Sequence, residues 1–132
     1  MPFVNVKLAK GQVDADKKQQ IIEKLTNLIV EVMDRDRSLT TVVVDDIEPG
    51  SWAIGGKAID PEQDGVSFVN IKVSKGTTNA GEMADMLHRT KAMMQEVLGN
   101  HATANYCIID ELNPSGWGFD GISMTERAKL EG

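Results

Sequence analysis

The strongest constraint on the fold is a strand-like stretch that occurs twice. Residues 2–11 read Pro-Phe-Val-Asn-Val-Lys-Leu-Ala-Lys-Gly and residues 67–76 read Ser-Phe-Val-Asn-Ile-Lys-Val-Ser-Lys-Gly, a shift of 67 − 2 = 65 positions. Apolar and polar residues alternate in both copies and β-branched residues are frequent, a pattern typical of a β-strand. The copies differ at their first residue, which is Pro2 in one and Ser67 in the other. A strand that returns at a fixed distance predicts an internal duplication.

The same shift holds along the rest of the chain without a gap. A residue is matched by an identical one 65 positions later at Phe3, Val4, Asn5, Lys7, Lys10, Gly11, Ala15, Glu31, Val32, Asp45, Pro49, Trp52 and Gly56. We therefore divide the chain into a first unit, residues 1–59, a Pro- and Gly-containing linker, residues 60–65, and a second unit, residues 66–132.

Each unit is predicted to be a strand, a helix and a strand. In the first, Asp14 is a helix N-cap and an apolar stripe at steps of three and four predicts a helix over 14–33, followed by a strand over 39–45. In the second, the equivalent helix is 79–98 and the strand 105–110. A β-α-β unit has parallel strands and a right-handed crossover. The expected fold is α+β: one four-stranded sheet with two helices on one face. We also expect the opposite face to be apolar and therefore covered by other chains.

Composition excludes several classes of partner. The net charge is −6 and no run of Lys or Arg is present, so we expect no nucleic acid partner. We expect no membrane span, because no apolar run approaches the roughly 18 residues needed. We expect a cytoplasmic protein without a leader, in which the single cysteine, Cys107, is a packed strand residue. No metal or other cofactor is expected, because the acidic pairs 45–46 and 110–111 lie on strands, where neighbouring side chains point to opposite faces.

Several features together resemble a known family. They are Pro2 behind Met1, the strand Phe-Val-Asn-Val-Lys-Leu at 3–8, and the segment Asp-Ile-Glu-Pro-Gly-Ser-Trp-Ala-Ile-Gly-Gly at 46–56. The first unit resembles a complete short subunit of the tautomerase superfamily, typified by 4-oxalocrotonate tautomerase. The second resembles a degenerate copy, so the whole chain resembles a fused version. The resemblance implies an isomerase without cofactor that forms a homo-oligomer, a trimer of fused chains in place of six short ones.

The chemistry of such an enzyme would depend on Pro2. If Met1 is removed, Pro2 supplies a secondary terminal amine, whose ordinary pKa of about 7.7–8 falls in an apolar pocket or beside cations. A neutral amine can take a proton from one atom of a substrate and return it to another. The resemblance implies that the substrate is a small carboxylate, a 2-hydroxy-dienoate or a similar enol of a 2-oxo acid, which becomes its keto form. The alternative is that Pro2 only begins an edge strand.

The sequence departs from the family at the residues that hold a dicarboxylate. The resemblance places one arginine just after the first strand's glycine and another in the second strand. Here those positions are Gln12 and either Thr41 or Val43; the second unit has Thr77 and Tyr106. The candidates for substrate binding are therefore Trp52, at the position of the family's aromatic residue, and Tyr106, Arg35 and Arg37.

Two other functions fit the same residues. One is a different reaction of the same amine, such as a dehalogenation, a hydration or a decarboxylation. The other is a non-catalytic assembly or binding protein in which Pro2 is incidental. Retention of Met1 would exclude every reaction that uses the amine.

Overall fold

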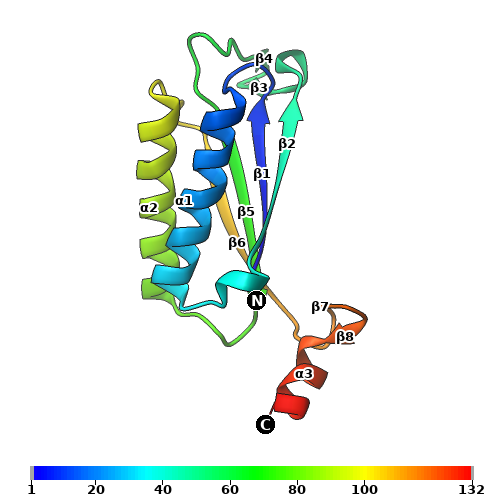
Figure 1. Cartoon of the computed structure of the whole chain (residues 1–132). Coiled ribbons are helices and arrows are strands. Elements are labelled where there is room, and N and C mark those ends of the chain that lie inside the picture. The colour runs from blue at the N-terminus through cyan, green and yellow to red at the C-terminus, as the bar shows by residue number, and fades with distance from the viewer. Residues whose placement is uncertain (1, 132) are drawn as a thin grey trace.

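The computed structural model describes residues 2–131 and has one main sheet. Its four strands are β1 (Phe3–Ala9), β2 (Thr41–Ile47), β5 (Ser67–Ser74) and β6 (Tyr106–Leu112), in the order β2-β1-β5-β6. β1 and β2 are parallel, β5 and β6 are parallel, and the two pairs meet at an antiparallel seam between β1 and β5. The helices α1 (Ala15–Met33) and α2 (Ala80–Leu98) lie side by side on one face of this sheet (Figure 1). The predicted α+β fold is confirmed.

Both long helices begin where the sequence predicts. The side chain of Asp14 accepts a hydrogen bond from the backbone N–H of Lys17 at 2.8 Å, and Asn79 accepts one from Glu82 at 2.9 Å. Each bond satisfies an N–H that the first helical turn would otherwise leave without a partner. The apolar stripe of each helix then faces the sheet, with Ile21, Leu25 and Ile29 from α1 and Met86, Met93 and Met94 from α2.

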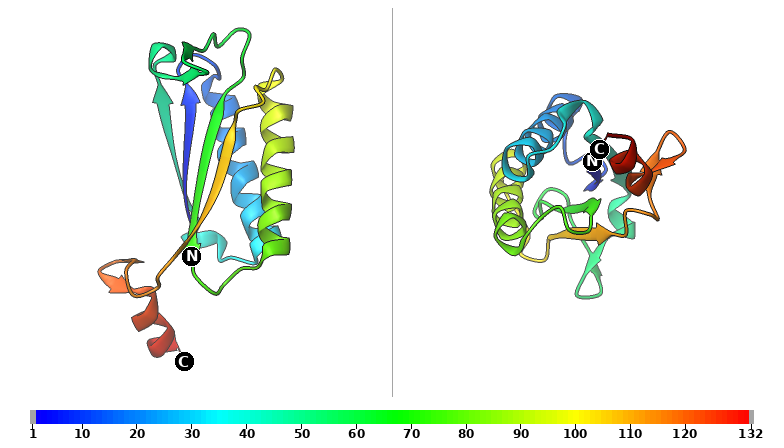
Figure 2. Two further views of the ribbon diagram at one scale, coloured as in Figure 1. Left: turned by 180° about the vertical axis from the view of Figure 1, so that it is seen from behind. Right: turned by 90° about the horizontal axis from the view of Figure 1, so that it is seen from below.

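The core lies between that helical layer and the sheet (Figure 2). Val4, Val6 and Leu8 of β1 are fully buried, as are Ile71 and Val73 of β5. Because strand residues alternate between faces, these side chains all point toward the helices, and the residues between them point to the free face. The methionines of α2 fill this core, which suits their flexible side chains.

The seam between β1 and β5 relates the two units. Asn5 lies opposite Asn70, its equivalent at the shift of 65 positions. Antiparallel pairing centred on two equivalent residues gives the units an approximate twofold relationship. The start of β1 therefore lies at one end of the sheet and the start of β5 at the other.

The second and fourth strands begin later than predicted. Arg37–Leu39 form a 3-10 turn, η1, because the side chain of Asp36 accepts a hydrogen bond from the N–H of Ser38 at 3.0 Å. Asn105 lies just before β6, where its side-chain oxygen accepts a hydrogen bond from the backbone N–H of Ser67 at 3.0 Å. Both strands also extend two residues beyond the predicted ends.

Two small hairpins and a third helix were not predicted. A short 3-10 turn, η2 (Pro49–Ser51), leads into the hairpin of β3 (Ala53–Ile54) and β4 (Lys57–Ala58), and β7 (Gly118–Phe119) pairs with β8 (Ile122–Ser123). Their turns, Gly55-Gly56 and Asp120-Gly121, have positive φ at both residues, as a two-residue hairpin requires. The helix α3 (Met124–Glu131) follows β8. We call residues 118–131 the C-terminal arm, which projects beyond the end of the sheet near the N-terminus (Figure 1).

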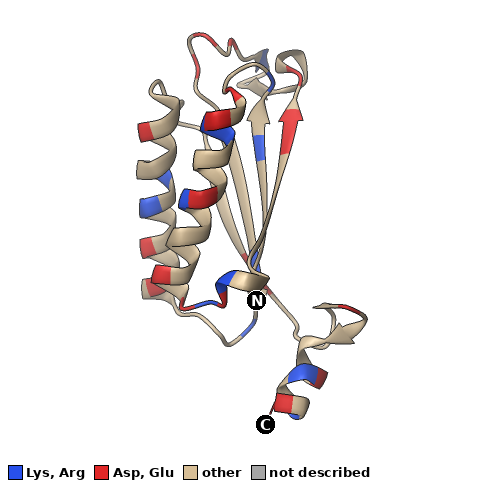
Figure 3. Cartoon of the chain, viewed as in Figure 1, with Lys and Arg blue, Asp and Glu red and all other residues tan. Residues whose placement is uncertain are grey.

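The free face of the sheet is more polar than predicted. At its centre, Asp45 accepts hydrogen bonds from Asn5 and Lys7, both at 3.0 Å. The second unit repeats this network with Asp110, Asn70 and Lys72. Figure 3 shows the basic band of β1 beside the acidic band of β2. Partly exposed apolar residues surround these networks, namely Phe3, Val43, Tyr106 and Ile108. The expected apolar face is therefore a mixed face.

Among residues 2–131, none of the helices combines the length and the hydropathy that crossing a bilayer requires.

Candidate functional site

Pro2 is buried and lines a cavity of about 360 Å³ at one end of the sheet. Its carbonyl oxygen accepts a hydrogen bond from the N–H of Thr41 at 3.3 Å, which ties the start of β1 to the start of β2. Apolar and aromatic side chains form most of the wall. We call this cavity the Pro2 pocket; its lining residues are Pro2, Phe3, Ser38, Leu39, Thr41, Lys72, Leu112, Trp117, Gly118, Phe119 and Met124.

A hydrogen bond holds the aromatic ring of Trp117 in this pocket. Its indole N–H donates to Oγ of Ser74 at 2.9 Å. Ser74 is the last residue of β5, and only 7 % of its surface is exposed. The hydrogen bond therefore fixes the plane of the ring against the sheet beside Pro2.

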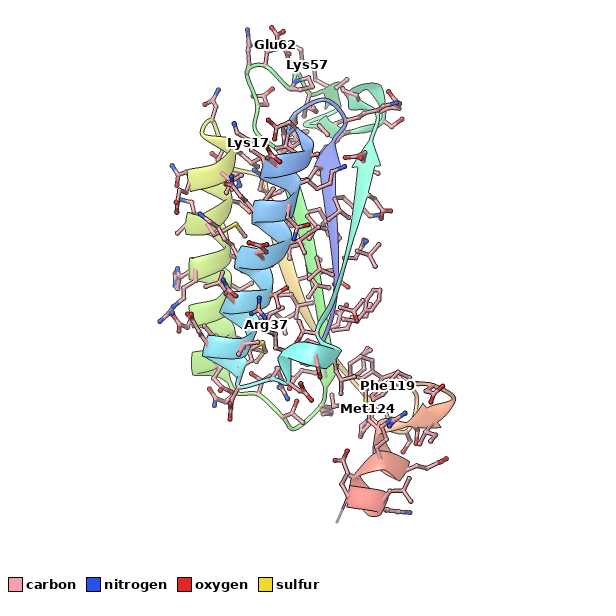
Figure 4. All side chains as sticks on the ribbon, viewed as in Figure 1. Lys17, Arg37, Lys57, Glu62, Phe119 and Met124 are labelled. Carbon is pink, nitrogen blue, oxygen red and sulfur yellow. The ribbon has the colours of Figure 1, made fainter. Side chains whose placement is uncertain are left out.

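The C-terminal arm closes another side of the Pro2 pocket. Phe119 and Met124 lie where the arm meets the sheet, near η1 (Figure 4). The guanidinium carbon of Arg127 lies 3.5 Å from the centre of the Phe119 ring, and its Nη2 donates to the Phe119 carbonyl at 2.7 Å. A cation stacked on an aromatic face is attracted by the ring's quadrupole. Arg127 thus holds Phe119 in place and brings a positive charge close to the pocket.

Lys72, the cationic residue in the lining of the Pro2 pocket, is already neutralised. Lys72 Nζ lies 3.0 Å from Oδ2 of Asp110. The hydrogen bonds from Asn70 and then from Lys72 hold the pKa of Asp110 below its usual range. This carboxylate is therefore charged at neutral pH and compensates Lys72.

A matching pocket surrounds Ser67 at the opposite end of the sheet. It has a volume of about 400 Å³ and is lined by Lys7, Ile47, Ser51, Trp52, Ala53, Ser67, Phe68, Ala104 and Tyr106. We call it the Ser67 pocket. All of these residues except Ser51 have their equivalent, 65 positions away, in the lining of the Pro2 pocket. Taken in the order of that list, with Ser51 left out, the equivalent residues of the Pro2 pocket are Lys72, Leu112, Trp117, Gly118, Pro2, Phe3, Leu39 and Thr41.

Trp52 and Tyr106 were expected close to Pro2 of the same chain or of a neighbouring chain; within one chain they line the Ser67 pocket. The reason is the antiparallel seam. β2 runs parallel to β1 and carries the chain away from Pro2, so Trp52 follows at the far end. Tyr106 begins β6 beside Phe68 and is likewise at the Ser67 end. Beside Pro2, the equivalent positions are filled by Trp117 and Thr41. The sequence carried a signal for this, because the repeat of the segment around Trp52 at Trp117 was visible.

Arg35 and Arg37 line neither pocket. Arg35 Nη2 donates to the carbonyl and the hydroxyl of Thr77 at 2.8 and 2.9 Å. Burial lowers the pKa of Arg35, and the negative charges of Glu82 and Asp34 offset part of this effect. Arg37 Nη1 donates to Asn27 Oδ1 at 2.6 Å. Both arginines join structural elements in this chain. Arg37 is labelled in Figure 4.

A structural residue, Gln12, occupies the position at which the resemblance implies the first arginine. The side-chain amide of Gln12 donates to the carbonyl of Val66 at 2.9 Å and accepts from its N–H at 2.8 Å. Val66 is fully buried, and Gln12 satisfies both of its backbone polar groups. Gln12 therefore fixes the start of β5, and with it Ser67.

The single cysteine is not activated as a nucleophile. Burial raises the pKa of the Cys107 thiol to about 11, so the thiol is protonated at neutral pH. In the described part of the chain, no three His, Cys, Asp or Glu side chains gather as ligands for a metal ion.

Sequence comparison connects the first unit with short bacterial proteins. Residues 2–60 match the family described as Tautomerase enzyme. A probable tautomerase of Dickeya dadantii is 37% identical over 59 residues, which span 45% of this chain and 88% of that protein. A probable tautomerase of Helicobacter pylori strain J99 is 33% identical over 61 residues, spanning 45% of this chain and 90% of that protein.

Structural comparison extends the likeness to the whole chain. A fused 4-OT described as a wild type symmetric trimer aligns with a TM-score of 0.82 and 13% identity, over 95% of this chain and 98% of that one. A member of the cis-3-chloroacrylic acid dehalogenase family aligns with a TM-score of 0.83 and 19% identity, over 98% of this chain and 87% of that one. At these identities the likeness shows a shared fold.

Proposed function

This chain belongs to the tautomerase family, and on that premise we propose that it converts a 2-hydroxy-dienoate, or a similar enol of a 2-oxo acid, to its keto form with Pro2 as general base. The observation that carries the proposal is the position of Pro2. It is buried in a cavity of about 360 Å³ whose walls are largely apolar and aromatic. After removal of Met1, such a pocket disfavours the charged form of the Pro2 amine and leaves it a neutral base near pH 7.

The reaction needs only one proton to move. The amine of Pro2 takes the proton from the enol hydroxyl, and the electron pair of that bond forms the carbonyl. The conjugated double bonds shift, and the protonated amine returns the proton to a carbon of the substrate. Atoms and electrons balance without an oxidant or a cofactor.

The pocket favours a substrate with one carboxylate. Lys72 is paired with Asp110, and both positions of the family's arginines lack an arginine. A dicarboxylate therefore lacks the two charge-assisted hydrogen bonds that a pair of arginines would donate, each worth about 1.5–3 kcal/mol. Arg127 stacks on Phe119, a residue of the pocket lining, and is the cation that we assign to a single carboxylate.

The test is a panel of enols of 2-oxo acids, assayed with protein whose mass confirms the loss of Met1. We expect turnover of monocarboxylate enols, and we expect Pro2→Ala to lower kcat/KM by roughly 10²-fold or more, the scale of a general base. Alanine also permits removal of Met1, so the variant differs only in the amine. Pro61→Ala, in the linker, is the matched control. Turnover that persists in Pro2→Ala would exclude Pro2 as the base.

The same panel tests the alternative chemistry. The fold is shared with a member of the cis-3-chloroacrylic acid dehalogenase family, and the Pro2 amine could act as an acid in such a reaction. Release of chloride from chloroacrylates, without turnover of enols, would assign the chain to that alternative. Absence of both activities in the Met-free protein would favour a non-catalytic binding protein.

We further propose that the chain forms a homotrimer through its free sheet face and its C-terminal arm. Apolar residues remain partly exposed on that face, and Leu130 of the arm is 76 % exposed. The fused 4-OT with this fold is described as a trimer. Sedimentation at micromolar concentration tests the assembly, and a stable monomer would contradict it.

A further inference from the structure

We propose that the Ser67 pocket is a second binding site, which holds a planar monocarboxylate without reacting with it. The hydrogen-bond donors of the pocket define this class of ligand. The similarity between this ligand and the substrate rests on the function proposed for Pro2. The pocket is the larger of the equivalent pair, at about 400 Å³ against about 360 Å³. Duplication has therefore left a complete cavity at a position that has lost its proline.

The tryptophan of the Ser67 pocket has a free donor that its counterpart lacks. Beside Pro2, the indole N–H of Trp117 is bound to Ser74. The residue equivalent to Ser74 in the first unit is Ala9, which has no acceptor side chain. Among residues 2–131, the Trp52 indole N–H has no hydrogen-bond partner within the chain. An indole N–H can only donate, so it favours a ligand with an acceptor atom.

The hydroxyl group of Tyr106 is also free. Within the described residues it has no hydrogen-bond partner from a side chain, and within one chain Tyr106 is 68 % exposed, so no other part of that chain covers its ring. The two neutral donors of Trp52 and Tyr106 line one cavity and match the acceptor oxygens of a carboxylate or a keto group. Hydrogen bonds to a charged acceptor are the stronger kind.

The charges of the pocket favour one negative group. None of its lining residues is an Asp or a Glu, so no lining carboxylate repels an anion. Lys7 Nζ lies 3.0 Å from Asp45 Oδ2 and is compensated by it. The pocket therefore offers no unpaired cation for a second carboxylate. The walls made by Trp52, Phe68 and Ile47 suit a flat, unsaturated carbon chain.

The pocket binds without proton transfer because it holds no base equivalent to Pro2. Ser67 lies inside the chain, and its backbone nitrogen is an amide that donates to Asn105 Oδ1 at 3.0 Å. The lining contains no histidine, no carboxylate and no unpaired amine. A bound enol would therefore stay an enol.

The two tryptophans make the test direct, because each pocket contains one of them and the chain has no other. In Trp117→Phe protein, Trp52 alone reports on the Ser67 pocket. The probe is sorbate, a planar dienoate without an enol hydroxyl, which cannot be tautomerised as the proposed substrate is. We expect a saturable change in Trp52 emission, and we expect sorbyl alcohol, which lacks the carboxylate, to give none.

A variant of the donor Tyr106 identifies the site. Tyr106→Phe should raise the dissociation constant of sorbate by about fivefold to tenfold, the scale of one hydrogen bond. The control is Ser115→Ala, whose hydroxyl contacts Thr125 outside the pocket. Thermal unfolding of each variant identifies any that is misfolded. The comparison of sorbate with sorbyl alcohol tests the role of the carboxylate without any variant of the Ser67 pocket.

The outcomes separate this inference from the function proposed for Pro2. If the protein turns over enols but the emission of Trp52 does not respond to sorbate, the second site is overturned and the function proposed for Pro2 is not. A response that Tyr106→Phe does not weaken would also overturn it, because the ligand would then lie elsewhere. A saturable response in protein without any turnover would support the second site and count against the catalytic proposal.

Discussion

The indole N–H of Trp117 donates to the hydroxyl of Ser74 at 2.9 Å, and this bond joins the segment after β6 to the last residue of β5. Trp117 lies in the second unit, yet it forms a wall of the pocket that contains Pro2 of the first. Neither unit alone therefore forms the Pro2 pocket. The antiparallel seam between β1 and β5 brings the two contributions together.

We predict that Ser74→Ala lowers kcat/KM by about threefold to tenfold, the value of one lost hydrogen bond. Ser74 acts as a positioning residue, because it orients the ring of Trp117 and does not line the pocket. In a Trp52→Phe background, the emission of Trp117 should change when the N–H loses its acceptor, which a purely structural effect elsewhere would not produce. Unchanged emission together with unchanged kcat/KM would contradict the role assigned to Ser74.

A second prediction concerns the residue that replaces the family's first arginine. Gln12→Ala leaves the buried N–H and carbonyl of Val66 without partners, which should lower the free energy of unfolding by about 1–3 kcal/mol. Chemical denaturation measures the change. Gln19→Ala is the matched control, because Gln19 bonds only to Glu23 on the exposed side of α1. An equal loss in both variants would show that Gln12 has no special structural role.

The sequence predicts the sheet and the long helices because their signals are local. Asp14 and Asn79 each cap a helix whose apolar residues recur at helical spacing, and the tertiary structure does not override either signal. The repeat at 65 positions then correctly indicates two equivalent β-α-β halves. The C-terminal arm was missed although Asp120-Gly121 is a common hairpin turn, because the flanking strands are only two residues long.

The site could be predicted only in part, because its geometry depends on strand direction. Pro2 follows from the sequence, but the pairing of Pro2 with Trp117 in place of Trp52 follows from the antiparallel seam. The direction in which the two β-α-β units meet decides which tryptophan lies beside Pro2 within one chain. The structural role of Gln12 was likewise hidden, because its partner Val66 is 54 positions away in the sequence.

A third prediction follows from the two aspartates on the free face. Hydrogen bonds from Asn5 and then Lys7 lower the pKa of Asp45 below the ordinary 3.8, and Asn70 and Lys72 lower that of Asp110. The unfolded chain therefore binds more protons in this range, so stability rises with pH there. The stabilisation is complete above the unfolded value of 3.8 and is lost as pH falls through the lower folded values.

The double variant Asp45→Asn, Asp110→Asn should therefore show a flatter dependence of Tm on pH than the unmodified protein at and below about pH 4. Scanning calorimetry across that range measures the slope. Glu62→Gln, in the linker between β4 and β5, serves as the control with one carboxylate removed. If the double variant loses stability on acidification as steeply as the unmodified protein, these two carboxylates are not its cause.

The last prediction concerns the C-terminal arm. None of the residues of α3 is buried within the chain, and the arm projects beyond the sheet (Figure 1). Leu130 is 76 % exposed, so its side chain contributes little to the stability of one chain. If the arm packs against a neighbouring chain, burial of Leu130 there is worth about 1.5–3 kcal/mol. Leu130→Asp should then raise the dissociation constant of the assembly by roughly tenfold or more, measured by sedimentation at several concentrations.

Leu87→Asp makes the same change on α2, where the side chain is 39 % exposed, and should leave assembly intact. Sedimentation of Leu130→Asp that is indistinguishable from the unmodified protein would show that the arm takes no part in assembly.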